Sequence, residues 1–402
     1  MKKTLGLYIH IPFCVSKCAY CDFLSFPISR DTPPPDSISP DVVSQYVEAL
    51  IMEIKNYQEN EFELYQVGSI FLGGGTPSIL AGEEIDKIFQ ALQDSFVIAK
   101  DAEISIEVNP GTVTKEKVKV WERIGINRIS IGLQSAGDDE LKVLGRVHTF
   151  QQFQETYTMV REAGFGNINI DLISGIPGQT IDGFIKTLDT VGRYNPEHIS
   201  AYSLMIEAGT PFGKRYGERE GQEHIADREI LPLPSEDVDW TMYRQTEDIL
   251  SSFGYRRYEI SNYAKEGFMC KHNTGYWERE EYLGIGLGAA SLIKDTRFRN
   301  VSDLQMYFER VKKKQSAREE SDTEVLSLKE QMDEFLFLGL RRIKGVSKEK
   351  FRQCFGEELE TVYQTAMRKL VGEGLLMIEG DSVRLTKRGI DISNAVFVEF
   401  LC

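Results

Sequence analysis

The feature that most constrains the fold is an alternation of β-rich runs and amphipathic, helix-like segments over the first half of the chain. The six β-rich runs are residues 5–9, 68–72, 103–107, 128–133, 167–173 and 198–205. The helix-like segments between them are residues 41–57, 83–96, 114–124, 150–163 and 181–194. Strands that alternate with helices form a parallel sheet. The pattern therefore predicts an α/β protein built on a partial, six-stranded (β/α)6 barrel.

Composition narrows the class of protein. A chain of 402 residues with 41% apolar residues can bury a large core, and its length predicts two or three domains. A net charge of −15 argues against nucleic acid as a partner, because Lys and Arg supply affinity for phosphates. Pro12 interrupts the only apolar run that resembles a signal peptide, and no run reaches the ~20 residues that span a bilayer. We therefore expect a cytoplasmic protein.

A cysteine cluster follows the first predicted strand. Cys14, Cys18 and Cys21 are spaced C-x3-C-x2-C. A structural zinc site needs four ligands, usually from two C-x2-C pairs, and the other cysteines form no second pair. Three thiolates can instead hold an iron-sulfur cube that keeps one iron open to a small molecule. This interpretation is favoured over zinc or buried thiols.

Residues 27–40 contain five of the thirteen prolines, which exclude a regular helix or a central strand there. We expect a surface loop after the cluster, and a lid over the open iron is the less favoured alternative.

Glycine and polar residues stand where the predicted strands end. The sequence Gly73 to Pro77 reads GGGTP, whose glycines allow close backbone approach and offer amide donors to a carboxylate, although a tight turn would use the same residues. Glu107, Gln134 and Asp171 belong to the next three strands or follow them. Functional groups gather at the carboxyl ends of barrel strands. Each polar group alone could have a structural partner, but together they indicate one shared ligand.

The cysteine spacing, with Tyr20 before the third cysteine, resembles the radical S-adenosylmethionine (SAM) superfamily. The resemblance implies a [4Fe-4S] cluster whose unique iron binds the methionyl group of SAM, and a radical formed by one-electron cleavage of the sulfonium. It sharpens to the oxygen-independent coproporphyrinogen III oxidase-like family through Tyr8 ahead of residues 10–14, the GGGTP loop and residues 132–135. By this likeness the contacts to SAM are Tyr8, Tyr20, Gly74, Gly75, Thr76, Glu107, Gln134, Arg146 and Asp171.

Two departures from the oxidases point to another branch. The oxidases carry a further cysteine two residues after the third ligand, where this chain has Phe23. They also have additional residues ahead of the barrel, whereas this chain enters its first strand almost at once. The pattern resembles the HemW branch, whose members are described as haem chaperones.

A second motif lies beyond the barrel, after a predicted helix at residues 235–253 and a predicted strand at residues 255–260. It reads His-Asn-x-x-Tyr-Trp and resembles a signature of the HemW branch, in which this signature is associated with haem binding. Imidazole is a standard haem ligand, and aromatic rings can cover a porphyrin face. The residues are His272, Asn273, Tyr276 and Trp277. A packed loop with an ordinary histidine is the alternative, and His10, His148 and His198 remain candidate ligands.

The glycine-rich residues 283–291 fit neither a dinucleotide nor a phosphate motif and are expected to pack against the barrel or a cofactor.

The last part of the chain predicts a small separate module. Predicted helices at residues 331–340, 348–355 and 358–373 and a β-wing at 375–385 resemble a winged helix. Residues 322–402 hold twelve Lys or Arg against fourteen Asp or Glu, so we expect a packing or docking domain rather than a DNA-binding one.

These observations predict three domains: the barrel at residues 1–210, an extension carrying the His-Asn-x-x-Tyr-Trp element at 211–320, and the winged-helix-like domain at 321–402.

The leading hypothesis is a haem chaperone that binds a [4Fe-4S] cluster, SAM and haem and delivers haem to acceptor proteins such as respiratory enzymes. Through such acceptors it would associate peripherally with membranes, and a homodimer is one alternative for its assembly. The rival is a coproporphyrinogen III oxidase, and a radical enzyme with another substrate is a third hypothesis.

Overall fold

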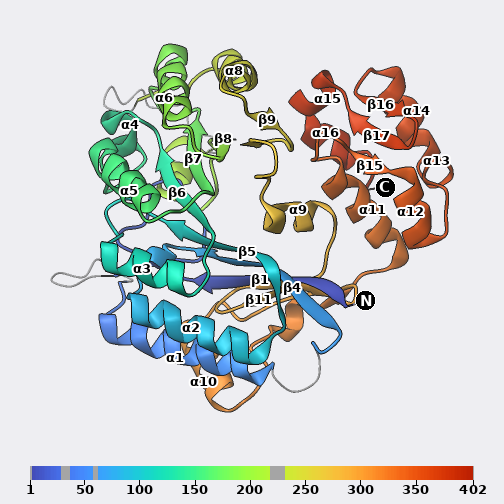
Figure 1. Ribbon diagram of the computed structural model, residues 1–402. Coiled ribbons are helices and arrows are strands. Elements are labelled where there is room, and N and C mark those ends of the chain that lie inside the picture. The colour runs from blue at the N-terminus through green and yellow to red at the C-terminus, as the bar shows by residue number, and fades with distance from the viewer. Residues whose placement is uncertain (1, 29–36, 58–61, 218–230, 402) are drawn as a thin grey trace.

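The computed structural model describes residues 2–28, 37–57, 62–217 and 231–401. Its main feature is a sheet of twelve strands in the order β14-β13-β12-β11-β1-β4-β5-β6-β7-β8-β10-β9 (Figure 1). The six strands from β1 to β8 in this order are mutually parallel. Their bounds are β1 Lys3–Ile11, β4 Tyr65–Gly74, β5 Ile98–Val108, β6 Arg128–Gln134, β7 Ile168–Ser174 and β8 His198–Ser203. All six predicted strands are present, and the partial barrel is confirmed.

Helices cover the outside of this sheet, with α1 and α2 beneath β1 and β4 and with α5 and α6 beside β6 and β7 (Figure 1). Their bounds are α1 Pro40–Asn56, η1 Pro77–Ile79, α2 Gly82–Ser95, α3 Lys115–Arg123, α4 Asp138–Val143, α5 Phe150–Glu162 and α6 Ile181–Tyr194. Three of them begin after a threonine whose hydroxyl accepts a backbone amide of the first turn, at Thr114, Thr149 and Thr180. The five predicted helices are confirmed, and α4 was not predicted.

Strand alternation sorts the side chains into an apolar outer layer and a polar interior. On β1, Leu5, Leu7, Ile9 and Ile11 are fully buried in the main core. Successive side chains of a strand point to opposite faces, so the residues between them face the interior of the barrel. The interior residues on the other strands include Ser69, Glu103, Ser130, Asn169, Asp171 and His198, which bond with one another or with α9 (Lys271–Trp277). Glu107 also faces the interior, where it accepts the Gly74 amide and is repelled by Asp171. This interior suits a polar ligand better than a packed aliphatic core would.

Further strands extend the barrel at both edges. β11 Tyr282–Ile285 pairs parallel with β1, and β12 Ala290–Ile293, β13 Thr296–Arg299 and β14 Glu324–Val325 follow antiparallel. The glycine-rich segment therefore packs against the barrel as predicted, but as a paired strand and turn. Its strand was missed because glycine is depleted in strands. At Gly284 an added Cβ would lie 2.2 Å from the Ala290 carbonyl oxygen, so only glycine fits this close approach.

At the other edge, β10 Asn262–Ala264 pairs antiparallel with β8, and β9 Arg256–Arg257 pairs with β10. The continuous strand predicted at residues 255–260 was wrong, because the backbone turns where the Tyr258 amide donates to the Asn262 carbonyl.

The short parallel pair β2 Phe13–Cys14 and β3 Phe26–Pro27 holds both ends of the cysteine loop. Most of the expected proline-rich loop, residues 29–36, lies outside the described residues.

Four helices connect these strands: α7 Pro211–Tyr216, α8 Glu236–Ser252, α9 Lys271–Trp277 and α10 Leu304–Lys312, with the 3-10 turn η2 Glu320–Asp322 after α10. α8 matches the predicted helix. α9 carries the His-Asn-x-x-Tyr-Trp element and lies between the barrel and the C-terminal helices (Figure 1). Within the ranges described above, no helix is both long and apolar enough to cross a bilayer.

The C-terminal domain has its own core, which contains Leu336, Phe351, Tyr363 and Val383. Its elements are α11 Leu328–Gly339, β15 Val346–Ser347, α12 Lys348–Phe355, α13 Leu359–Val362, α14 Gln364–Gly372, β16 Leu376–Glu379, β17 Ser382–Leu385, α15 Lys387–Asp391 and α16 Ser393–Val398. The winged-helix-like pattern is confirmed, with β16 and β17 as the wing. The predicted helix at 358–373 is interrupted at Tyr363, where the backbone leaves helical geometry.

Candidate functional site

The cysteine loop is fixed to the barrel by backbone bonds on several sides. The amide of Ile28 donates to the carbonyl of Cys14 at 2.8 Å, the amide of Ala19 donates to that of Leu144 at 3.0 Å, and the amide of Phe212 donates to that of Ala19 at 2.8 Å. Cys14, Cys18 and Cys21 are half-buried on this loop, and none is in a disulfide. The loop therefore presents three free thiols where β1 ends.

The three thiols lie close to one another on the cysteine loop. Burial raises the pKa of Cys14, and it raises the pKa of Cys21 to about 11, with the neighbouring cysteine thiolates raising both further. The thiols thus lie close enough to interact electrostatically. Among the described residues, no three His, Cys, Asp or Glu side chains are placed to hold a single metal ion. A [4Fe-4S] cluster takes its thiolates at separate irons, and three free thiols on one loop are a donor set that such a cluster can use.

Arg146 sets the charge beside the thiols. Its Nη1 donates to Cys18 Sγ at 3.6 Å, and its Nη2 donates to the Gly132 carbonyl at 2.6 Å and to Asn109 Oδ1 at 2.5 Å. An added Cβ on Gly132 would lie 3.3 Å from Nη2, so glycine leaves room for the guanidinium. The charge of Arg146 also opposes the rise in the pKa of the Cys14 thiol. Arg146 therefore belongs to the cluster side of the site.

The GGGTP loop is built for close packing. An added Cβ on Gly75 would lie 2.6 Å from the Phe13 carbonyl oxygen. The amides of Gly75 and Thr76 donate to the carbonyls of Ile11 and Phe13 at 2.9 and 2.7 Å, and the Gly74 amide donates to Glu107 Oε2 at 3.1 Å. These three amides therefore already have partners within the protein, and their contact with a ligand carboxylate stays a prediction. Thr76 Oγ1 donates to Cys14 Sγ at 3.5 Å.

Two carboxyl groups come together in the interior beside this loop. Burial, and then repulsion by Asp171, raise the pKa of Glu107 to about 8. Burial also raises the pKa of Asp171, although Asn169 Nδ2 and Ser130 Oγ donate to its carboxylate at 2.8 and 3.1 Å. Two adjacent carboxyls that resist ionisation together form a favourable site for a cation.

Gln134 ends β6 in a left-handed conformation, with φ of 74°. This backbone is uncommon for a residue other than glycine and turns the chain sharply after the strand. Its side chain is buried at the same end of the barrel as Glu107 and Arg146. The predicted SAM contacts on β4 to β7 are therefore brought together at the strand ends.

The two predicted tyrosines occupy different environments. Tyr8 lies inside the barrel, with its hydroxyl 3.0 Å from His10 Nδ1 and its ring stacked on Phe71 at 6.5 Å between centroids. Tyr20 is on the cysteine loop, where burial raises its pKa and the Arg146 guanidinium opposes that rise. Tyr20 thus lies beside the cysteines, whereas Tyr8 lies deeper in the barrel. Phe23, at the position where the oxidases have cysteine, is 60% exposed.

His272 on α9 is held inside the barrel by both ring nitrogens. Nδ1 lies 2.9 Å from Ser69 Oγ and Nε2 lies 2.9 Å from Tyr276 Oη, while the ring stacks on Phe71 at 5.2 Å. Burial, and then the Arg128 charge, lower the pKa of His272 to about 3. The imidazole is therefore neutral, as a metal ligand must be, but one of its two hydrogen bonds has to break before a nitrogen can bind iron.

The His272 element and the cysteine loop are separate regions of one barrel. Ser69, which bonds His272, precedes Gly74 by five residues on β4, and ~3.3 Å per strand residue gives about 16 Å between these levels. The other three histidines in the described part of the chain are also engaged. His10 and His148 lie within hydrogen-bonding distance of the carbonyls of Leu24 and Leu133, and His198 bonds with Asn169 and Tyr258.

Glu103 is an important residue that the sequence analysis missed. Its carboxylate accepts the amides of Lys271 and His272 at 3.0 and 3.2 Å and the Cys270 thiol at 3.3 Å. It therefore fixes the start of α9 inside the barrel. Its spacing of four residues from Glu107 on one strand places both carboxyls on the interior face, and this signal could have identified it.

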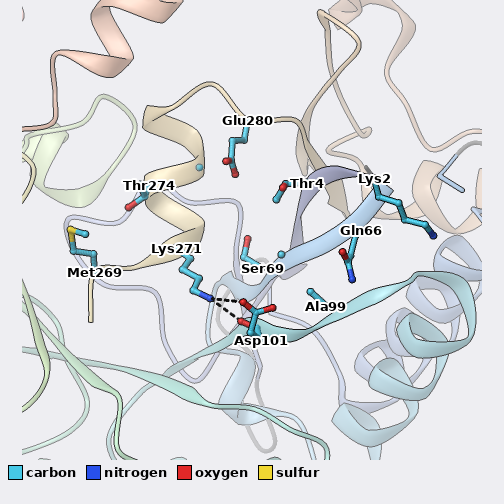
Figure 2. A pocket seen from close by; sticks show the side chains of 12 residues that line it. Lys2, Thr4, Gln66, Ser69, Ala99, Asp101, Met269, Lys271, Thr274 and Glu280 are labelled. Atoms are coloured by element: carbon cyan, nitrogen blue, oxygen red, sulfur yellow. Dashed lines mark hydrogen bonds and ion pairs between the residues drawn. The ribbon is translucent and has the colours of Figure 1, made fainter. Parts of the chain in front are cut away.

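A cavity lies on each side of α9. The floor cavity, of about 430 Å3, is at the start of the barrel strands and is lined by Lys2, Thr4, Gln66, Ser69, Asp101 and Lys271 among others. Figure 2 shows it, with Lys271 reaching Asp101 across its edge. The aromatic cavity, of about 340 Å3, is lined by Tyr8, Tyr276, Trp277, Tyr282, Arg279 and Arg297 among others. His272 bonds a lining residue of each, Ser69 and Tyr276.

Known proteins resemble the whole chain. Residues 8–191 match the radical SAM superfamily and residues 326–392 match the HemN C-terminal domain. The structure of coproporphyrinogen III oxidase (HemN) from Escherichia coli aligns with a TM-score of 0.81 and 22% identity over 99% of this chain and 90% of that one, which shows a shared fold. The protein named heme chaperone HemW from Lactococcus lactis is 35% identical over 100% of this chain and 98% of its own length. Its namesake from Bacillus subtilis is 34% identical over 98% of both. The chain therefore belongs to the radical SAM superfamily and, within its coproporphyrinogen oxidase-like family, to the HemW branch that the sequence resemblance indicated.

Proposed function

We propose that this protein is a haem chaperone that holds a [4Fe-4S] cluster and SAM at the carboxyl ends of the barrel strands and binds haem beside α9. The observation that carries the proposal is the 35% identity, over the whole chain, to a relative named heme chaperone HemW. The neutral, buried imidazole of His272 beside an aromatic cavity supports the haem part.

The residues divide the work between the two regions. Cys14, Cys18 and Cys21 would ligate the cluster, and Arg146 would balance its negative charge. A bound cluster and SAM together supply one-electron chemistry. The carboxyls of Glu107 and Asp171 would orient SAM through its ribose hydroxyls and positive sulfonium, because charge-assisted bonds are the stronger ones.

At α9, His272 would ligate the haem iron, with Asn273, Tyr276 and Trp277 as neighbouring contacts. Tyr276 bonds Nε2 and Ser69 bonds Nδ1, so removing one partner frees one nitrogen. Iron binding would break one of these two bonds. Haem would then pass to an acceptor protein, such as a respiratory enzyme.

Matched single-atom changes test which nitrogen ligates haem. Anaerobically reconstituted protein is titrated with haem, and the absorption spectrum and affinity are recorded for wild type, Tyr276→Phe and Ser69→Ala. We expect Tyr276→Phe to tighten binding if Nε2 is the ligand and Ser69→Ala to do so if Nδ1 is. His272→Ala should weaken binding and change the spectrum. An unchanged spectrum and affinity in His272→Ala would exclude it as the ligand.

Coproporphyrinogen III oxidation is the second candidate function, favoured by the shared fold with the oxidase HemN. The same reconstituted wild type is therefore supplied with SAM, a reductant and coproporphyrinogen III. Our proposal predicts no multiple-turnover formation of protoporphyrinogen IX, together with transfer of bound haem to an apo-acceptor. Multiple turnovers would establish the oxidase instead.

A further inference from the structure

Two arginines of the aromatic cavity share one carboxylate from the C-terminal domain. Arg279 Nε lies 3.0 Å from Glu334 Oε2, and Arg297 Nη2 lies 2.6 Å from Glu334 Oε1. The Glu334 side chain on α11 is only 6% exposed, and that of Arg279 is 12% exposed. The charges of Glu334 and Arg279 are therefore largely withdrawn from water, where ion pairs are screened less and unpaired charges are costly, whereas the Arg297 side chain is 41% exposed.

The pairing leaves capacity for a further acceptor. Asp295 on a neighbouring turn contributes a second carboxylate, 2.9 Å from Arg279 Nη2. Arg297 Nε is buried and makes no hydrogen bond among the residues that the structure describes. Guanidinium groups offer five donors and bind carboxylates in pairs of parallel bonds. Arg297 thus has a buried donor that its present partner does not use.

Aromatic rings line the same cavity. The rings of Tyr276 and Tyr282 meet edge to face at 4.6 Å between centroids, and Tyr276 also contacts His272. Tyr8 and Trp277 complete this aromatic lining. A cavity of about 340 Å3 is at the small end of ligand sites, which are ~300–1,000 Å3. It can enclose part of a flat ligand, with arginines available for acidic groups.

We propose that Arg279 and Arg297 bind the carboxylate side chains of the tetrapyrrole, whose ring lies against Tyr276, Trp277 and Tyr282, and that Glu334 occupies these arginines when no ligand is bound. This inference rests on the proposed haem-binding function and adds its anion-recognition site. Ligand entry displaces the Glu334 carboxylate, so loading of the cavity loosens the contact between α11 and the barrel extension.

The test compares iron protoporphyrin IX with its dimethyl ester, in which both carboxylates are replaced by uncharged methyl esters. Affinities are measured by absorbance titration for wild type, Arg297→Gln and Arg299→Gln. Arg299 is the matched control, because it lies on the same strand but pairs with Asp322 outside the cavity. We expect Arg297→Gln to bind the acid about tenfold more weakly, consistent with one lost charge-assisted bond, and the ester as wild type does. Arg299→Gln should leave both affinities unchanged.

Glu334→Gln provides the opposite change. It removes the competing charge and should tighten binding of the acid several-fold without affecting the ester. Equal affinity of wild type for acid and ester, or equal acid affinity in Arg297→Gln and Arg299→Gln, would overturn the carboxylate site while leaving haem binding intact. A wild type that binds neither compound would overturn the proposed function and this site together.

Discussion

The site at the carboxyl ends of the barrel strands, here called the mouth, and the region around α9 differ in how their functional groups are held. At the mouth, each strand or the loop after it contributes one group, and the carboxyls of Glu107 and Asp171 lie together with raised pKa values. At α9, the central group is a neutral imidazole whose two nitrogens are already bonded. The mouth is thus arranged to receive a charged ligand directly, whereas the α9 region has to exchange internal bonds for a ligand.

The strongest test of this difference removes a thiol. Cys18→Ala should abolish the cluster, because three thiolates are the minimum set and Cys18 is also bonded by Arg146. Iron and sulfide content and visible absorbance after anaerobic reconstitution measure the effect. Cys354→Ala is the matched control, since Cys354 is exposed on α12 far along the chain. If the mouth and the α9 region are independent, Cys18→Ala should leave the thermal stability of α9 the same as in wild type. Full iron content in Cys18→Ala would contradict the assignment.

A second test uses the raised pKa of Glu107. Below pH about 8 the carboxyl is mainly protonated, and above it the charged form attracts a cation. SAM affinity, measured by calorimetry on the cluster-loaded protein, should therefore rise as pH increases through 8. Glu107→Gln should remove this dependence and weaken binding about 10- to 100-fold, the range for a charge-assisted bond of ~1.5–3 kcal/mol.

Glu122→Gln, on the exposed surface of α3, is the control for a neutralised glutamate. It should bind SAM with the affinity and pH dependence of wild type. Unchanged affinity in Glu107→Gln, with the cluster intact, would remove Glu107 from the SAM site.

The meeting of polar groups at the mouth could be predicted from the sequence, because it depends only on the order of the strands. Strand ends of a parallel barrel converge by topology, so Glu107, Gln134 and Asp171 could be placed together from the order of strands alone. What it could not give was the hydrogen bonding of the GGGTP amides, which depends on how closely β2 approaches β4.

The α9 region was not predictable in the same way. Ser69, Glu103 and His272 are brought together from β4, β5 and α9, at separations of up to 203 residues. Arg279, Arg297 and Glu334 likewise meet only because the C-terminal domain docks beside the barrel extension. No periodic pattern encodes such contacts, since each depends on tertiary packing. The motif indicated the chemistry of the element but not that its histidine is enclosed.

A third test probes what holds α9. Glu103→Ala removes the acceptor of two α9 amides and of the Cys270 thiol, which leaves buried donors unsatisfied. We expect a loss of about 1–3 kcal/mol in the free energy of unfolding, with faster hydrogen exchange in α9 than at the mouth. Denaturant unfolding and hydrogen-exchange mass spectrometry measure these effects, and Glu122→Ala is the surface control. Unaltered exchange in α9 would show that Glu103 does not anchor it.

The smallest expected effect concerns the ion pair at the edge of the floor cavity. Lys271 Nζ donates to the Asp101 carbonyl at 2.8 Å and lies 3.8 Å from Asp101 Oδ2, and the two side chains are 56% and 90% exposed. Exposed pairs contribute ~0–1 kcal/mol and are screened by salt, so Lys271→Ala should change the free energy of unfolding by less than Glu103→Ala does. The difference from wild type should shrink further at high salt. A larger loss in Lys271→Ala than in Glu103→Ala, measured by the same denaturant titration, would place the anchor of α9 on the outer floor of the barrel rather than in its interior.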